Sequence, residues 1–158
     1  MSRLKVGDHA SDFKLRDQFN QPHHLSDLLT RQAVVLVFYP LDQSPFCTLQ
    51  LRSIHKNMAR FNDCHVTVLG VNHADDVSHE RFSAKKQLAV RLLSDTDYHV
   101  SAAYDCLFRI AGFKVIRRTV VGIAQDGTIR YYQRGMPSDH EVLAHIGNCR
   151  QPAAPARA

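Results

Sequence analysis

The sequence predicts an α/β domain in which a central mixed β-sheet carries helices on both faces and follows an N-terminal β-hairpin. Three observations predict this fold. Strand-like and helix-like segments alternate along the chain, the two middle strands are apolar throughout, and the last two strands are joined by a tight turn. Because strands buried on both faces form continuous apolar runs, we expect helices to cover the sheet from both sides.

The composition is typical of a soluble globular protein. Of the 158 residues, 44% are hydrophobic and 22% are charged, so we expect residues 1–150 to form one domain with its own core. Residues 151–158 are rich in proline and alanine, and we expect them to form a flexible tail. No segment resembles a membrane span or a secretory signal, which predicts a cytoplasmic protein that does not contact a membrane.

Composition also argues against several functions. The net charge of +5 comes from dispersed basic residues, whereas nucleic-acid binding favours a basic run interleaved with aromatics. The ten histidines form no zinc-type motif, so we expect neither a metal nor a cofactor. The four cysteines, at positions 47, 64, 106 and 149, are widely spaced, which argues against a structural disulfide framework.

The first elements are short. Two apolar patches, at residues 13–15 and 23–25, flank a polar segment that contains a proline, which predicts a β-hairpin. Residues 26–29 then predict a brief helical turn.

The segment from Val34 to Arg52 organises the rest of the chain. Residues 34–39 are apolar and rich in β-branched side chains, and Pro40 ends the run, which predicts a buried strand. Apolar residues after Cys47 recur at helical spacing, so Cys47 should lie in or beside the first turn of a helix. Free N–H groups and the positive end of the helix dipole favour a thiolate there, although a buried, inert cysteine is the other interpretation. The residues expected to form the apolar stripe are Leu49, Leu51, Ile54, Met58 and Phe61.

Strands and helices alternate through the middle of the chain. The predicted elements are a buried strand over 66–71, a helix that starts near Asp75 with Val77 and Phe82 inward, an edge strand over 90–93, and a short helix over 99–104.

The last third predicts a connecting loop, a hairpin and a helix. We expect residues 112–116 to form the loop, and residues 118–124 and 128–133 to form two strands joined by an Asp-Gly turn. Ser138 and Glu141 have capping-box spacing and open a final helix. The predicted elements thus follow the order of a thioredoxin-like fold with an N-terminal extension: a hairpin, then βαβα, then ββα.

Residues 38–48 resemble the active-site signature of a known family. They read FYPLDQSPFCT, which is similar to the F-Y-P-x-x-x-[TS]-P-x-C-T signature of peroxiredoxins of the bacterioferritin-comigratory, or peroxiredoxin Q, group. Further stretches agree in order and spacing within residues 6–27, 78–82 and 92–95. The resemblance covers about residues 5–146. It implies an antioxidant enzyme that uses a thiol to reduce hydrogen peroxide and organic hydroperoxides.

The resemblance implies roles for four residues. Cys47 would be the nucleophile, and Arg118 would keep it ionised and donate to the peroxide, with the adjacent Arg117 leaving a one-residue ambiguity. Ser44 would offer its hydroxyl to the peroxide, and Pro40 would shield Cys47 from water. Taken singly, Ser44 could equally be a capping residue, Pro40 a strand terminator and Arg118 a surface charge.

Three positions depart from the family pattern. Gln50 stands where many relatives carry glutamate, so the hydrogen bond is kept but the charge is lost. Arg52 and Ser83 stand where members of the group place a resolving cysteine. The usual two-cysteine cycle is therefore in doubt.

We predict a one-cysteine cycle in which an external thiol reduces the oxidised Cys47. The reductant would be a thioredoxin, a glutaredoxin or a low-molecular-weight thiol, and the protein is expected to be a monomer. We expect Cys64 and Cys106 to be buried and Cys149 to be exposed. The alternative is a thioredoxin-fold redox sensor or binding module with weak peroxidase activity, which the changes at Gln50 and Arg52 favour.

Overall fold

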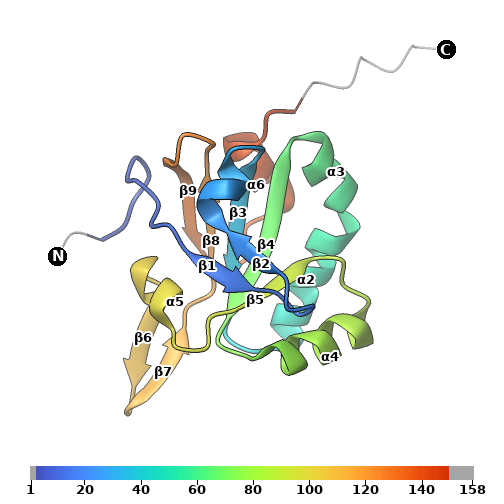
Figure 1. Ribbon diagram of the computed structural model, residues 1–158, viewed down its shortest axis with the longest axis vertical. Helices are drawn as coiled ribbons and strands as arrows, with labels where there is room; N and C mark the ends of the chain where they lie inside the picture. Colours follow the sequence, from blue (N-terminus) through green and yellow to red (C-terminus); the bar gives the residue numbers. More distant parts are fainter. Residues whose placement is uncertain (1–2, 150–158) are drawn as a thin grey trace.

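A mixed five-stranded sheet forms the centre of the protein (Figure 1). The computed structural model describes residues 3–149, so the predicted tail at 151–158 lies outside the described residues. In spatial order the strands are β5 (Arg91–Ser94), β4 (Val66–Asn72), β3 (Ala33–Phe38), β8 (Thr119–Ile123) and β9 (Ile129–Arg134). Strands β5, β4 and β3 are parallel, whereas β8 and β9 pair antiparallel. The predicted central mixed sheet is confirmed.

Helices cover both faces of the sheet. Alternate residues of β3 point to opposite faces, so each face offers apolar side chains for helices to pack against. Val35 and Val37 pack into one hydrophobic cluster, and Val34 and Leu36 pack into another. The first cluster includes residues of α2 (Pro45–Lys56), α3 (Met58–Asp63), α4 (Asp76–Lys86) and α6 (Asp139–Ile146), and the second includes residues of α1 (Leu25–Leu29) and α5 (His99–Ala103). Among residues 3–149, no helix is both long enough and apolar enough to cross a membrane.

The N-terminal hairpin is present as predicted. Strand β1 (Lys14–Arg16) pairs antiparallel with β2 (Pro22–His24). The carboxylate of Asp17 stabilises the connecting turn by accepting from the N–H groups of Phe19 and Gln21. The brief helical turn that was expected to follow is α1.

A second hairpin replaces the loop expected at residues 112–116, so that prediction is wrong. Strand β6 (Leu107–Ile110) pairs antiparallel with β7 (Phe113–Ile116). The two-residue turn between them places Ala111 and Gly112 at φ values of 49° and 83°. Two-residue hairpin turns need positive φ and usually signal it with Asn-Gly or Asp-Gly, so alanine in the first position hid the turn.

Two side chains expected to point inward are exposed. Leu49 and Val77 are 63% and 50% exposed. In α2, the inward position beside Leu51 is taken by the polar Gln50, and in α4 the buried residues include His79. A hydrophobic pattern could not anticipate polar residues on the buried faces, because each of them has a specific partner elsewhere in the fold.

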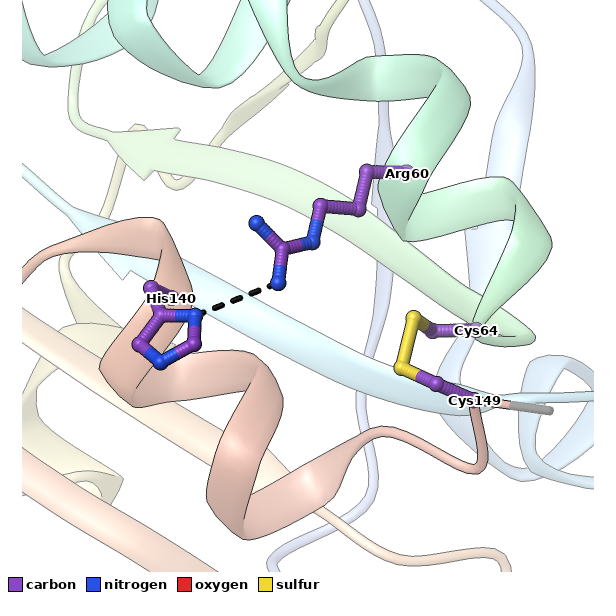
Figure 2. Close-up of a disulfide and its surroundings, with 4 residues drawn as sticks. All are labelled: Arg60, Cys64, His140 and Cys149. Atoms are coloured by element: carbon purple, nitrogen blue, oxygen red, sulfur yellow. Dashed lines mark hydrogen bonds between the residues drawn. A yellow bond between two sulfur atoms is a disulfide. The ribbon is translucent and has the colours of Figure 1, made fainter. Parts of the chain in front are cut away.

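A disulfide joins Cys64 and Cys149 (Figure 2), so the expectation of no structural disulfide is wrong. The two cysteines are 85 residues apart in sequence. The chain after α6 returns to the end of α3, where the Asn148 N–H donates to the Cys64 carbonyl at 3.0 Å. As expected, Cys64 and Cys106 are buried and Cys149 is exposed.

Candidate active site

Cys47 is the third residue of α2 and lies directly beyond the end of β3. Residues 40–44, which lead from β3 into α2, are called the active-site loop below. Ser44 is the N-cap of α2, and its Oγ accepts from the Cys47 N–H at 3.3 Å. Pro45 occupies the first helical position, where a missing N–H costs nothing. The local sequence therefore fixes a helix start that holds the cysteine at the positive end of the helix dipole.

Arg118 contacts this cysteine although it lies 71 positions later in the sequence. Its Nη2 donates to Cys47 Sγ at 3.1 Å, and its Nη1 donates to Gln50 Oε1 at 2.9 Å. The sheet register explains this approach, because Phe38 pairs with Thr119 across the antiparallel β3 and β8. The residue before Thr119 must therefore lie beside the chain that leaves β3.

Arg117 has a different environment. Its guanidinium lies over the ring of Phe108, 4.9 Å from the ring centroid. Of the two adjacent arginines, the structure therefore places Arg118, and not Arg117, against Cys47.

The sulfur of Cys47 is enclosed and lies against a positive charge. The Cys47 side chain is 0% exposed, and the guanidinium of Arg118 contacts the sulfur directly. A positive charge and a helix N-terminus both stabilise a thiolate relative to a thiol. Gln50 is neutral, so it orients Arg118 without competing for its charge. The Nε2 of Gln50 and the Oγ1 of Thr48 are buried and have no hydrogen-bond partner among residues 3–149.

Pro40 and Arg118 line the same surface hollow. The apolar side chains of Phe108, Val115 and Ile116 come from β6 and β7 and line the same hollow. The structure thus brings Pro40, Ser44, Cys47 and Arg118 together, and it adds an apolar surface that came from the hairpin missed in the sequence.

The other cysteines lie away from this site. Cys106 packs in the hydrophobic cluster on the opposite face of the sheet from Cys47. Burial raises the pKa of Cys106 to about 11, despite the opposing influence of Arg134, and its Sγ donates to the Tyr104 carbonyl. Cys64 precedes β4, at the edge where β3 begins, whereas Cys47 follows the end of β3. The six residues of β3 place these two ends of the strand roughly 20 Å apart.

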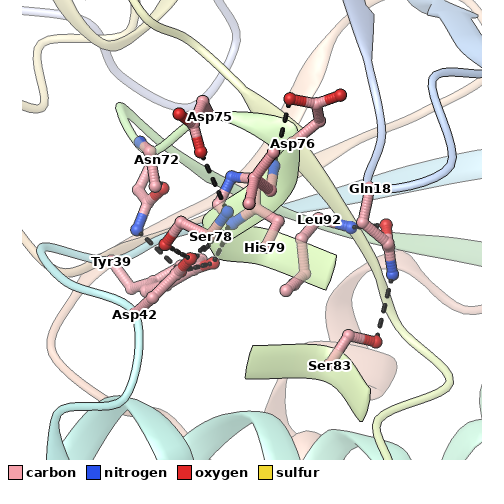
Figure 3. Close-up of polar contacts among 12 residues, drawn as sticks. Gln18, Tyr39, Asp42, Asn72, Asp75, Asp76, Ser78, His79, Ser83 and Leu92 are labelled. Carbon is pink, nitrogen blue, oxygen red and sulfur yellow. Dashed lines mark hydrogen bonds and ion pairs between the residues drawn. The ribbon is translucent and has the colours of Figure 1, made fainter. Parts of the chain in front are cut away.

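Sequence reasoning missed a buried polar group in the active-site loop. Asp42 contacts Tyr39 and His79, and the histidine is 0% exposed (Figure 3). His79 is hydrogen-bonded to Asp42 on one side of its ring and to the Leu93 carbonyl on the other. The available signal was an aspartate between apolar segments, which needs a partner when it is buried.

The chain is similar to a family and to solved structures. It matches the AhpC/TSA family over residues 6–132. Peroxiredoxin Bcp of Escherichia coli is 37% identical over 100 residues, which are 63% of this chain and 64% of that protein, so the match spans just under two thirds of either chain. Peroxidoxin BcpB from Mycobacterium tuberculosis superposes with a TM-score of 0.84 at 26% identity, covering 90% of this chain and 96% of that one. A PrxQ variant from Xylella fastidiosa superposes with a TM-score of 0.83 at 27% identity, covering 91% and 96%.

Proposed function

Since the chain belongs to the AhpC/TSA family and is a peroxiredoxin, a thiol-dependent peroxidase, we propose that Cys47 performs its reaction through a one-cysteine cycle. The thioredoxin-like fold predicted from the sequence is confirmed by the same structural likeness. The observation that carries the proposal is the contact of Arg118 with Cys47 Sγ at the N-terminus of α2.

In the proposed reaction, the Cys47 thiolate attacks one oxygen of the peroxide and breaks the O–O bond. The sulfur becomes a sulfenic acid, and the departing hydroxide or alkoxide takes up a proton to give water or an alcohol. Negative charge grows on the leaving oxygen, so donors fixed around the sulfur stabilise the transition state. Arg118 is such a donor, because its guanidinium is always charged and is already oriented by Gln50.

Ser44 and Pro40 are assigned supporting roles at the same centre. The Ser44 Oγ accepts from the Cys47 N–H, which leaves the hydroxyl proton free to donate to a peroxide oxygen. Pro40 offers no N–H to water and borders the hollow beside Arg118. This arrangement supports a role for Pro40 in keeping water from the sulfur.

The resolving step is assigned to an external thiol. Positions 52 and 83 hold arginine and serine, and Cys64 is paired with Cys149. Cys106 is buried on the opposite face of the sheet, and its raised pKa keeps it as an unreactive thiol near neutral pH. A thioredoxin, a glutaredoxin or a low-molecular-weight thiol would therefore reduce the sulfenic acid.

We assign hydrogen peroxide and organic hydroperoxides as substrates. Hydrogen peroxide needs only the donors at Cys47, and the apolar side chains of Phe108, Val115 and Ile116 offer a surface for an alkyl group. We further propose that the protein acts as a monomer in the cytoplasm.

Stopped-flow oxidation of the reduced protein tests the proposal. We expect a second-order rate with hydrogen peroxide that is orders of magnitude above that of a free thiol, and complete loss of this phase in Cys47→Ser. A rate like that of a free thiol would instead support the redox sensor or binding module. Turnover with a small thiol should persist when Cys64, Cys106 and Cys149 are all replaced by serine.

A further inference from the structure

Asp42 connects the active-site loop to three neighbouring elements (Figure 3). Its side chain is only 4% exposed, although it lies in a loop. Oδ1 accepts from the Tyr39 hydroxyl at 2.7 Å and from Asn72 Nδ2 at 3.1 Å. Oδ2 accepts from the Ser78 hydroxyl at 2.7 Å and from His79 Nδ1 at 2.8 Å. The donors come from the residue that follows β3, from the end of β4 and from the first turn of α4.

The ring of His79 bridges Asp42 and β5. Nε2 lies 3.1 Å from the carbonyl oxygen of Leu93, and a carbonyl only accepts, so Nε2 carries a proton. Burial alone would raise the pKa of Asp42, but hydrogen bonds from His79, Tyr39 and Ser78 outweigh it and lower that pKa. The two residues form a buried hydrogen-bonded pair, with Nδ1 of His79 2.8 Å from Oδ2 of Asp42.

A buried polar pair contributes little to stability on balance, because removing both groups from water offsets most of their attraction. The location of this pair points to a geometric purpose. Asp42 lies two residues before Ser44, and the intervening Gln43 has a φ of 64°, which is unfavourable for a residue other than glycine. The loop therefore needs an anchor to hold this conformation, and Asp42 is its buried contact.

We propose that the hydrogen-bonded Asp42–His79 pair is a positioning device that fixes the active-site loop so that Ser44 and Cys47 face Arg118. The inference rests on the proposed function of Cys47 and adds two residues to it. Neither residue touches the sulfur in the structure. Both act through the loop, by tying it to α4 and, through the Leu93 carbonyl, to β5.

Removing the Asp42–His79 contact should change the rates of two reactions of Cys47 in opposite directions. Peroxide reduction needs the sulfur, Ser44 and Arg118 at fixed positions around the peroxide, and a misplacement of about 1 Å can lower the rate about 100-fold. Alkylation by iodoacetamide needs only access to the sulfur, which is 0% exposed in the anchored state. A loosened loop should therefore slow peroxide reduction and speed alkylation.

The experiment compares Asp42→Asn, His79→Gln and the double variant with the wild type. Each is measured at a temperature where near-ultraviolet circular dichroism shows it fully folded. We expect each single variant to lose about 10-fold to 100-fold in peroxide rate and to gain in alkylation rate. The double variant should be no slower than the slower single variant, because the two residues act as one unit. If Asp42→Asn does not fold, His79→Gln supplies the same comparison, since it keeps one donor and removes the ring that bridges Asp42 and the Leu93 carbonyl.

Asp17→Asn is the matched control. Asp17 is also buried, at 1% exposure, and pairs with His23 at 2.8 Å, but it lies in the turn of the N-terminal hairpin. This variant should lose stability and keep both Cys47 rates.

The outcomes separate the two proposals. A fast wild type whose Asp42→Asn and His79→Gln variants react within about twofold of it, per folded molecule, would overturn the positioning role alone. A wild type no faster than a free thiol would overturn the proposed function, and with it the role assigned to the anchor.

Discussion

Arg118 donates to Cys47 Sγ at 3.1 Å although 71 residues separate them in sequence. The antiparallel pairing of β3 with β8 brings them together, because Phe38 lies opposite Thr119. The second arm of the same guanidinium binds Gln50, three residues after the cysteine. One side chain thus links Cys47, its helix and the neighbouring strand.

Replacing Arg118 by lysine should lower the second-order rate with peroxide by about 100-fold to 1,000-fold. The loss is that expected when one donor to a developing oxyanion is removed, since lysine cannot bind the sulfur and Gln50 at once. Stopped-flow kinetics measures this rate. Arg117→Lys is the matched control, because Arg117 stacks on Phe108, and it should react like the wild type. Equal losses in the two variants would contradict the assignment.

Replacing Ser44 by alanine should have two separable effects. Loss of the N-cap should reduce the free energy of unfolding by about 1 kcal/mol, and loss of the hydroxyl should slow peroxide reduction. Ser138 caps α6 with the same geometry, so Ser138→Ala should show the stability loss alone. Urea unfolding and stopped-flow kinetics measure the two effects. If the peroxide rate of Ser44→Ala equalled that of Ser138→Ala, the hydroxyl would have only a capping role.

Local sequence was sufficient for the elements that carry Cys47. An apolar run ended by Pro40, a capping serine and a helical stripe are features of contiguous residues, and the structure has the corresponding strand, cap and helix. The resemblance to a family supplied Arg118, which no local pattern indicates.

Contacts between distant segments could not be predicted in the same way. The Asp42–His79 pair depends on α4 packing beside the active-site loop, and the Cys64–Cys149 disulfide depends on the chain after α6 returning to α3. Each contact follows from the assembled sheet, and neither leaves a spacing signature in the sequence.

The disulfide should stabilise the fold without affecting catalysis. Closing a loop of this length reduces the entropy of the unfolded chain, so the Cys64→Ser and Cys149→Ser double variant should lose about 2–4 kcal/mol of unfolding free energy. Its peroxide rate should match that of the wild type, because the disulfide lies beside the start of β3 whereas Cys47 follows the end of β3. Reductant should lower the melting temperature of the wild type and leave that of the variant unchanged. Loss of turnover with a small thiol would instead indicate a resolving role.

Cys106 should make stability depend on pH in alkaline solution. Burial raises its pKa from 9.0 to about 11 in the folded protein, so between these values the unfolded chain loses a proton that the folded protein keeps. The stabilisation is therefore fully present below the unfolded value and is lost as pH rises toward the folded one, by on the order of 2 kcal/mol. Urea unfolding should show a steeper alkaline loss in the wild type than in Cys106→Ala. Parallel pH profiles would contradict the assignment.

The most direct measurement is mass spectrometry of the protein after one equivalent of hydrogen peroxide, without added thiol. We expect a single oxygen atom on the peptide that contains Cys47, trapped as a sulfenic acid adduct, with Cys106 still a free thiol. A stoichiometric disulfide between Cys47 and another cysteine of the chain would contradict the one-cysteine cycle, and oxidation that spares Cys47 would contradict its role as the nucleophile.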